Sequence, residues 1–556
     1  MRTARRQRLV LVLSGLLAAT ALGPSAPVSV DGPVQHFVVL YAEGAEPSAA
    51  RRAVGASGGT VLSDDPDTGI AAVTSSDPRF VDRARAHRVL AGAARDRVVG
   101  RSPTRRAWES STAVAGAAAG SAGSAGSAAA STGEPLESHQ WDMRALRQAE
   151  ARAAHRVDRR VLVAVIDTGV DGSHPDLAPV LDRERSRNFT TDIPTDPGGT
   201  ELDGPCEVAG CVDPVDRDDD GHGTHVASLI AAPVNGRGIA GTAPGVRIVN
   251  LRAGQDSGYF FLQPTLDAIT YAGRIGVDVA NLSFYTDPWL FNCADNPADS
   301  PAEQQEQRTI VASMQRAVDV ARKRGVTLIA AAGNEGLDLG APGVDASSPD
   351  YPQPTSTRDD TRTRALDNAS CLSMPSEATG VLDVTATGPS GRKASYSSYG
   401  VEQAVVAAPG GDALDGARPF PGNQVLGAFP RAVLRAEGLI AADGRPLDDS
   451  VVRDCQPAGC GYYRWLSGTS MAAPHAAGVA ALIVSRHGGR DAAHTGGWTL
   501  RPSTVERLLR ATAVDRACPA AGVQVYEDGS RHRCAGTASS NGFFGDGTVD
   551  ALRAVS

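Results

Sequence analysis

Short apolar segments alternate with longer segments of helical periodicity after about residue 139. Apolar runs of this length favour buried strands, and helices between successive strands are typical of a parallel sheet covered on both faces. The pattern therefore predicts an α/β fold with a doubly wound parallel sheet. The predicted strands are 161–166, 247–251, 277–282 and 326–332, the predicted helices are 222–232, 264–273 and 304–324, and the aperiodic regions 285–303, 336–372 and 411–464 are expected to be insertions or long surface loops.

A smaller unit, from residue 35 to about 100, precedes this region. Its pattern predicts a strand–helix–strand–strand–helix–strand module of ferredoxin-like α+β type. The turn signal Asp65-Pro66-Asp67-Thr68-Gly69 separates the two middle strands. The predicted elements are strands 35–41, 60–62 and 70–74, helix 48–56 and an Arg-rich helix 80–99.

Two further N-terminal segments are recognised by composition. Basic residues, an apolar stretch from Leu9 to Leu22 and then small residues describe a secretory signal peptide, and an apolar stretch this short is a poor membrane span. Residues 113–131 are almost all Ala, Gly and Ser, which is typical of a flexible linker open to proteolysis. The predicted organisation is 1–26 signal peptide, 31–101 leading module, 102–138 linker and processing region, and 139–556 main domain.

Composition narrows the class of protein. The 556 residues are 42% apolar and 21% charged, which excludes wholesale disorder, and the net charge of −9 argues against general binding of nucleic acid or anionic membranes. The N-terminal quarter is net basic and the remainder net acidic, so an electrostatic attraction between them is expected. No apolar span follows the main domain, so we expect no stable membrane anchor.

The eight cysteines are expected to form disulfides in an exported protein. Close spacing suggests Cys206–Cys211, Cys455–Cys460 and Cys518–Cys534, which leaves Cys293–Cys371. About 105 pairings of eight cysteines are possible, and sequence alone does not choose among them. Tight Cys/His clusters of the kind that bind zinc do not occur.

Three polar segments lie at positions where parallel sheets typically carry their active-site residues. Asp167-Thr168-Gly169 follows a buried strand, a position typical of an active-site carboxylate, although a turn Asp that caps its own backbone is the plainer interpretation. Asp220-Gly221-His222-Gly223-Thr224-His225 opens an apolar helix, and a neutral imidazole there can act as a general base. The acidic residues before it imitate an EF-hand loop, but Ala227 stands where the bidentate Glu is required.

The third segment is Gly468-Thr469-Ser470-Met471-Ala472-Ala473-Pro474-His475, at the start of another apolar helix. Pro474 is expected in the first turn. The free N–H groups and positive dipole end of a helix favour an oxyanion beside Ser470, whereas a plain N-cap is the structural alternative.

Taken together, in the order Asp, His, Ser, these segments resemble the subtilisin-like serine proteases, or subtilases. The resemblance covers about residues 140–555 and the leading module. Further matching motifs are Ser173-His-Pro-Asp-Leu177, Gly241-Thr-Ala-Pro244, Ala330-Ala-Ala-Gly-Asn-Glu-Gly336, Ala394-Ser-Tyr-Ser-Ser-Tyr-Gly400 and Ala407-Ala-Pro-Gly410.

The resemblance implies a secreted serine endopeptidase. Asp167 would orient His222, His222 would accept the proton of Ser470, and Ser470 would attack the scissile carbonyl. Asn334 would donate to the oxyanion beside the Ser470 N–H. His225 and His475 lie further along their helices and are expected to be packing residues.

The resemblance also implies accessory sites. Ser283, in Asn281-Leu-Ser283, would pair with the substrate backbone, while Phe284 and Tyr285 replace the usual Gly-Gly and are expected to narrow the specificity pocket. A structural calcium would be held by Gln140, Asp176 and Asn235, and catalysis would need no cofactor.

The leading module resembles the propeptide of these proteases and would act as an intramolecular inhibitor until cleaved. We expect a monomer with a polypeptide substrate and no nucleic-acid partner. An inactive peptide-binding relative is the first rival, and a serine esterase is the second, although Gly468-x-Ser470-x-Ala472 is not the esterase Gly-x-Ser-x-Gly elbow.

Overall fold

The computed structural model describes residues 34–96, 98–101 (backbone), 133–195, 201–286, 288–341, 343–346, 348, 363–457 and 459–556. The predicted signal peptide at 1–26 and the Ala/Gly/Ser-rich stretch at 113–131 lie outside these residues.

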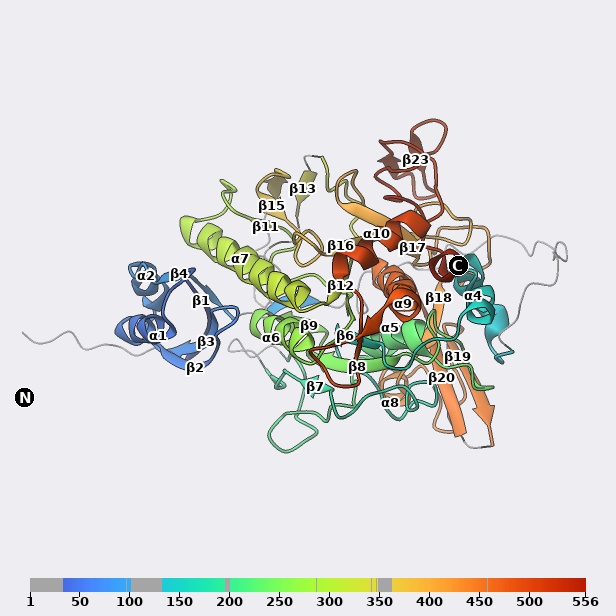
Figure 1. The fold of residues 1–556 in the computed structure, drawn as a ribbon, viewed down its shortest axis with the longest axis horizontal. Helices are drawn as coiled ribbons and strands as arrows, with labels where there is room; N and C mark the ends of the chain where they lie inside the picture. Colours follow the sequence, from blue (N-terminus) through green and yellow to red (C-terminus); the bar gives the residue numbers. More distant parts are fainter. Residues whose placement is uncertain are drawn as a thin grey trace, which may run out of the picture.

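The main domain is built on a seven-stranded sheet in the order β17-β16-β12-β10-β6-β8-β7 (Figure 1). Every neighbouring pair of strands in it is parallel. Its strands are β6 Leu162–Asp167, β7 Arg187–Asn188, β8 Arg247–Arg252, β10 Val279–Leu282, β12 Thr327–Ala331, β16 Leu382–Thr387 and β17 Ala404–Pro409.

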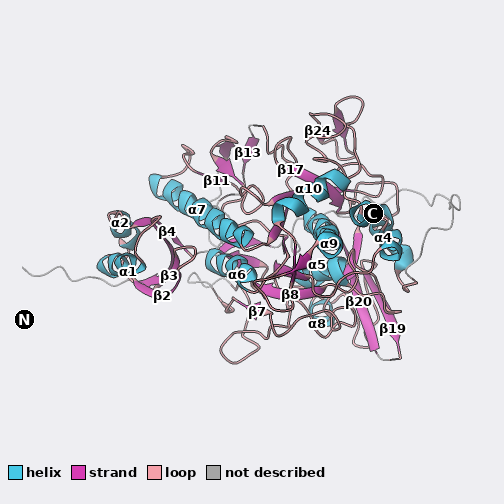
Figure 2. Cartoon of the chain, viewed as in Figure 1, coloured by secondary structure: helices cyan, strands magenta, loops and turns pink. Residues whose placement is uncertain are grey.

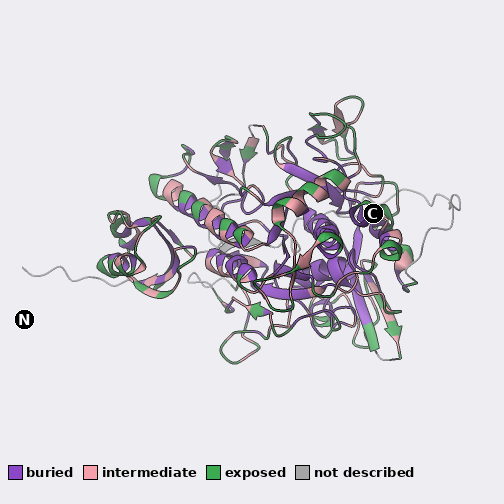
Figure 3. Ribbon diagram, in the orientation of Figure 1, coloured by how far each residue is buried: buried purple, intermediate pink, exposed green. Residues whose placement is uncertain are grey.

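Helices cover both faces of this sheet, as predicted (Figure 2). Alternate residues of β6 point to opposite faces. Val163 and Val165 join the core beneath α5 His222–Ala231 and α9 Thr469–His487. Ala164 and Ile166 join the core beneath α6 Leu262–Arg274 and α7 Pro301–Lys323. The sheet and the inner faces of these helices are buried (Figure 3). Among helices of the described residues, none is long and apolar enough to cross a bilayer.

Region 411–464 is more regular than predicted. It contains β18 Val425–Ala428, α8 Arg431–Ala436, β19 Val451–Gln456 and β20 Gly459–Leu466, and the strands form an antiparallel sheet in the order β18-β20-β19. The run Tyr462–Trp465 of β20 is buried on both faces, which explains why the sequence shows no alternation there. The remaining elements of the main domain are α3 Trp141–Ala145, α4 Gln148–Ala154, β9 Tyr259–Phe261, β11 Asn292–Cys293, β13 Gly343–Asp345, β14 Arg364–Leu366, β15 Cys371–Leu372, β21 Gly489–Arg490, β22 Trp498–Thr499, α10 Pro502–Thr512, β23 Val523–Val525, β24 Arg531–Arg533, α11 Ala551–Val555 and the 3₁₀ turn Glu137–His139.

All four predicted disulfides are present. Cys455–Cys460 closes the β19–β20 hairpin, and Cys293–Cys371 joins β11 to β15. Cys206–Cys211 and Cys518–Cys534 close short surface loops.

The leading module has the predicted order of elements in a sheet of order β2-β3-β1-β4. Its elements are β1 Gln35–Tyr41, α1 Pro47–Ala56, β2 Thr60–Asp65, β3 Ile70–Ser75, α2 Phe80–Arg85 and β4 Leu90–Arg95. The prediction of one helix over 80–99 was wrong, because α2 ends at Arg85 and β4 pairs with β1. Pairing within the sheet outweighs the helix propensity of this Ala- and Arg-rich segment.

The module packs against α6 and α7 (Figure 1). Val38, Leu40 and Ile70 share a core with Leu266 of α6 and Met314 of α7.

Polar contacts surround this apolar interface. Arg316 donates to the carbonyls of Tyr41 (2.8 Å) and Thr68 (3.0 Å), and Arg274 pairs with Asp65 at 2.6 Å. In these contacts the positive charges lie on the main domain and the acceptors on the module. The net charges of the two parts had suggested the opposite arrangement.

Candidate active site

Asp167 is the last residue of β6, between neighbours β8 and β10. Its Oδ1 accepts hydrogen bonds from the backbone N–H of Thr168 (2.8 Å) and from Nδ1 of His222 (2.7 Å). Both side chains are fully buried. The structure therefore brings together the first two residues of the predicted triad.

Two glycines permit this approach. A Cβ on Gly223 would lie 2.1 Å from the carbonyl oxygen of Gly169, so only hydrogen fits between the loop after β6 and the start of α5. Gly221 has φ of 102° and lies against the ring of Phe429, a position that a side chain could not share.

Asp218 shapes the same turn. Its oxygens accept from the N–H groups of Gly221 (2.9 Å) and Thr224 (2.9 Å) and from the hydroxyl of Thr168 (3.1 Å). The acidic segment that imitated an EF-hand thus caps the entry to α5.

The electrostatics favour a basic imidazole. Burial would lower the pKa of His222, but the negative charge and hydrogen bond of Asp167 outweigh it and raise the pKa above its usual value. With Nδ1–H donated to Asp167, the neutral ring has its lone pair on Nε2, and Nε2 has no hydrogen-bond partner within the part of the chain that the structure describes. It is available to accept a proton.

Ser470 lies in the first turn of α9 and is buried. Its hydroxyl donates to the carbonyl of Ser283 at 3.1 Å, so the structure does not show it bonded to His222. The backbone carbonyl of Ser470 accepts the hydroxyl of Ser283 at 3.0 Å.

This second bond has a cause in the sequence. Pro474 lies in the second turn of α9, not in the first as predicted, and it has no N–H to donate to the carbonyl four residues earlier. That carbonyl belongs to Ser470, so the hydroxyl of Ser283 supplies the missing donor.

The side chain of Asn334 adjoins the start of α9. Its Oδ1 accepts from the N–H and from the hydroxyl of Thr469, both at 2.9 Å. These two bonds set the orientation of the amide and leave the Nδ2 protons to donate elsewhere. An oxyanion donor beside Ser470 requires this orientation.

His225 and His475 are buried and bonded to the framework. His225 contacts the carbonyl of Arg464 (3.1 Å), and burial lowers its pKa to about 3. His475 contacts the carbonyl of Pro409 (2.8 Å) and the carboxylate of Asp142 (3.1 Å). The contact with Asp142, which ties α3 to α9, had no signal in the sequence.

Comparison with known proteins decides the family. A sequence model of the subtilase family matches residues 158–547, most of the chain. The chain belongs to the subtilase family.

Relatives of this subtilase include subtilisin DY of Bacillus licheniformis, 26% identical over 64% of this chain and 84% of that protein. M-protease of Shouchella clausii is 26% identical over 61% of this chain, and thermophilic serine proteinase of Bacillus sp. strain AK1 is 29% identical over 58%. The matches span 59% and 52% of the lengths of these last two relatives.

The fold also resembles solved structures. The epidermin leader peptide processing serine protease of Staphylococcus aureus aligns with a TM-score of 0.59 at 19% identity, over 94% of this chain and 98% of that chain. Fervidolysin of Fervidobacterium pennivorans aligns with a TM-score of 0.55 at 20% identity, over 95% of this chain and 62% of that chain. The α/β subtilisin-like fold is therefore confirmed.

The predicted substrate strand of this subtilase adjoins a packed aromatic pair. Phe284, one residue after Ser283, is buried and stacks on Phe260 of β9 with ring centroids 4.2 Å apart. The ring therefore fills space between the segment after β10 and β9. Pairing of Ser283 with substrate stays a prediction.

The residues predicted to bind calcium have other partners. The side-chain amide of Gln140 exchanges two hydrogen bonds with the backbone of Ala240 (2.8 and 3.0 Å). Asp176 accepts from the hydroxyl of Tyr463 at 2.8 Å, and exposed Asn235 accepts from the N–H two residues on. The other carboxylate oxygen of Asp176 is buried and has no hydrogen-bond partner among the described residues. Calcium at these residues stays a prediction.

Sequence reasoning missed a buried charge beside the active site. Arg252, the last residue of β8, is fully buried and pairs with Asp213 at 2.8 Å and with Asp256. The signal available in the sequence was an arginine that directly follows an apolar strand.

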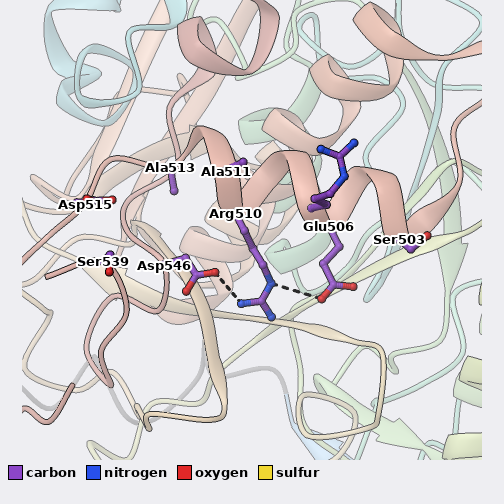
Figure 4. A pocket seen from close by; sticks show the side chains of 9 residues that line it. Ser503, Glu506, Arg510, Ala511, Ala513, Asp515, Ser539 and Asp546 are labelled. Atoms are coloured by element: carbon purple, nitrogen blue, oxygen red, sulfur yellow. Dashed lines mark hydrogen bonds and ion pairs between the residues drawn. The ribbon is translucent and has the colours of Figure 1, made fainter. Parts of the chain in front are cut away.

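A pocket of about 610 Å³ beside α10 is separate from the site (Figure 4). Arg510 pairs there with Asp546 (3.0 Å) and Glu506 (3.4 Å). The pair with Asp546 holds α10 to the C-terminal segment, whereas the pair with Glu506 lies within α10. None of the predicted catalytic residues lines the pocket.

The contact between Ser283 and Ser470 predicts an energetic coupling with Pro474. Ser283→Ala should lower the free energy of unfolding by about 1–3 kcal/mol, because a buried carbonyl loses its donor. Pro474→Ala should recover part of this loss in the Ser283→Ala chain, since the alanine has a backbone N–H to donate to the carbonyl of Ser470. Urea unfolding of the four chains, each carrying Ser470→Ala to prevent self-cleavage, measures the coupling. Equal effects of Pro474→Ala with and without Ser283 would refute it.

The raised pKa of His222 predicts a pH dependence. Catalysis needs the neutral imidazole, so kcat/KM should fall as pH drops through a pKa above 6.5. Asp167→Asn should move this acid limb to lower pH, because the charge that raises the pKa is lost. It should also reduce kcat by about 10⁴-fold, because an amide no longer holds the imidazole in the tautomer with its lone pair on Nε2. The pH profile for peptide cleavage is the measurement, with exposed Asp319→Asn as control. An unchanged acid limb in Asp167→Asn would contradict the assignment.

Proposed function

We propose that this subtilase is a secreted serine endopeptidase, made as a zymogen, that hydrolyses peptide bonds through an acyl-enzyme. The observation that carries the proposal is the 2.7 Å hydrogen bond between Asp167 and His222, in which Nε2 of the imidazole keeps no hydrogen-bond partner among the described residues.

The chemistry follows from these positions. Substrate binding would turn the hydroxyl of Ser470 from the carbonyl of Ser283 to Nε2 of His222. The imidazole takes the hydroxyl proton while the serine oxygen bonds to the scissile carbonyl carbon. The Nδ2 of Asn334 and the N–H of Ser470 donate to the resulting oxyanion. The imidazolium gives its proton to the leaving amine, and water then releases the acyl group by the same steps.

The rival functions lack comparable support. An inactive relative would not need the four catalytic residues, yet this chain has all of them: Asp167, His222, Ser470 and Asn334. The esterase alternative has the triad in a different chain order.

A zymogen is supported by the way the leading module docks. Its apolar face lies on α6 and α7, and the following strand, β5 Val98–Arg101, pairs antiparallel with β9. The loop that leads into β9 is joined to the catalytic carboxylate residue, since the N–H groups of Ala253 and Gly254 donate to the carbonyl of Asp167. A chain segment added at β9 therefore lies near the site, as a strand-adding inhibitor would.

Secretion is supported by the predicted signal peptide and by the four disulfides, which persist in oxidising compartments. We propose cleavage within 102–138 and a monomeric product.

Ser470→Ala should abolish peptide cleavage and leave the chain unprocessed, since maturation would be autocatalytic. Electrophoresis of the secreted chain and a fluorogenic peptide assay measure both effects, with Ser467→Ala as a matched control. Normal processing of Ser470→Ala would assign maturation to another protease.

Arg316→Ala should weaken inhibition by the module, because two carbonyls lose a charged donor. Losses of about 1–2 kcal/mol correspond to roughly a 10-fold weaker complex. The lag before activity appears in purified precursor should shorten accordingly, and exposed Lys323→Ala on the same helix is the control. Equal lags in the two variants would count against the docked module as inhibitor.

A further inference from the structure

Lys393 is one of only two lysines in the chain, and its side chain is buried. It directly precedes residues 394–399, which we call the support segment. The Nζ of Lys393 donates to two backbone carbonyls of this segment, those of Ala394 (2.8 Å) and Ser397 (2.6 Å). A single buried amino group therefore orients two peptide groups of the support segment.

Aromatic rings enclose the same amino group. The Nζ lies 4.9 Å from the ring centroid of Tyr399, 5.5 Å from that of Phe543 and 5.7 Å from that of Tyr526. Burial lowers the pKa of Lys393 well below its usual range, and the attraction of Asp412 offsets this only in part. Because a buried donor is costly unless it meets an acceptor, the two carbonyls are needed where they lie.

One of these peptide groups connects Lys393 to the active site. The carbonyl of Ser397 and the N–H of Ser398 belong to the same trans peptide group, so they point in opposite directions. Lys393 holds the carbonyl on its own side. The N–H points the other way and donates to the carbonyl of Gly333 at 3.0 Å. That carbonyl belongs to the peptide group that leads into Asn334.

The loop that carries Asn334 also pairs with the support segment further along. We call this loop, residues 333–339, the oxyanion loop. Three further backbone hydrogen bonds join it to the support segment, with the donor named first: Gly336 to Tyr396 (2.6 Å), Tyr399 to Leu337 (2.9 Å) and Leu339 to Tyr399 (2.6 Å). The position of the oxyanion loop is therefore set by the support segment, which Lys393 holds.

Residues that follow the catalytic helix cover this arrangement. Tyr526 lies within the loop closed by the Cys518–Cys534 disulfide, and its hydroxyl donates to the carbonyl of Lys393 at 3.0 Å. The ring of His532, in β24, lies against Gly336, since a Cβ there would be 3.0 Å from its Cε1. The C-terminal segment thus shields the amino group from water and contacts the oxyanion loop.

We propose that Lys393 is a positioning residue for the oxyanion donor Asn334 and acts through the peptide group between Ser397 and Ser398. The inference rests on the proposed function, in which Nδ2 of Asn334 donates to the oxyanion. Thr469 fixes the side-chain amide of Asn334, and Lys393 fixes the backbone that carries it. Both are needed, because a donor stabilises the oxyanion only from a preset position.

This role affects the transition state more than the bound substrate. Without the Nζ donor, the peptide group after Ser397 is free to turn, and the carbonyl of Gly333 loses its fixed partner. The oxyanion forms only during the reaction, so the displaced donor lowers kcat and leaves KM nearly unchanged.

The kinetic test compares Lys393→Met, Asn334→Ala and the double variant, each processed by a trace of tagged parent enzyme that is then removed. Methionine is similar in length to lysine but has no donor. Lys393→Met should lower kcat for a peptide substrate by about 10- to 100-fold, the effect of a small misplacement, with KM within about 2-fold. In the Asn334→Ala chain it should change kcat by less than about 2-fold, because the donor that it positions is absent.

Two controls separate positioning from other effects. Lys323→Met removes the other lysine, at an exposed position on α7, and Val505→Ala weakens the core beneath α10 far along the chain from both segments. Neither should change kcat. Equal kcat of Lys393→Met and parent, an equal fall with and without Asn334, or the same fall in Val505→Ala would each overturn the inference.

Hydrogen exchange measured by mass spectrometry on the full chain carrying Ser470→Ala needs no activity. Lys393→Met should speed exchange by about 10-fold in peptides from the oxyanion loop and the support segment, and leave peptides from β6 unchanged. Tyr526→Leu removes one covering ring and keeps the amino group, so it should have a smaller effect on the same peptides even if Lys393→Met does not fold. Faster exchange beside a parent enzyme that cleaves no peptide would refute the proposed function and retain the role of Lys393 in holding the loop. Unchanged exchange beside an active parent would overturn the inference alone.

Discussion

The close approach between the loop after β6 and the start of α5 is the constraint on which the site depends. The chain places a carboxylate at the end of β6, an interior strand of the sheet, and an imidazole at the first residue of a buried helix. They reach hydrogen-bond distance because Gly169 and Gly223 meet with no side chain between them. In this buried position water screens the negative charge of Asp167 only weakly. The attraction of Asp167 for the protonated imidazole therefore outweighs the effect of burial, and the pKa of His222 is raised.

The serine is held by a second set of contacts. Ser283, at the end of the neighbouring strand β10, and Ser470 each donate a hydroxyl proton to the carbonyl of the other. Pro474 makes this exchange necessary, since it removes the helical donor to Ser470. The same contact links the catalytic helix to the strand expected to bind substrate, so binding at that strand is positioned to release the hydroxyl.

Much of the fold could be predicted because β6, β8, β10 and β12 are nearly continuous apolar runs, and the helices between them have strong periodicity. The motif residues Asp167, His222 and Ser470 were recognisable because each lies at the end of an apolar strand or helix. Segment 80–99 could not be predicted well, because its alanines and arginines favour a helix until β1 offers a partner for β4. Strand β18 and the run Tyr462–Trp465 of β20 were missed because burial on both faces removes alternation.

Long-range polar contacts had no local signal. The net charges suggested a basic leading module on an acidic main domain. In the structure, Arg274 and Arg316 of the main domain bind acceptors on the module. The buried Arg252 and the carboxylates around it come from segments that only the folded chain brings together. The bonds of Gln140 to the backbone of Ala240 and of Asp176 to the hydroxyl of Tyr463 had no local signal either.

The central claim is that His222, held by Asp167, turns Ser470 into a nucleophile. Covalent labelling with a peptidyl phosphonate, followed by peptide mapping of the processed chain, tests it most directly. The account predicts a single label on Ser470, formed at least about 10³-fold more slowly when His222 is replaced by Ala. A processed chain that labels at another residue, or that labels Ser470 equally fast without the imidazole, would contradict it.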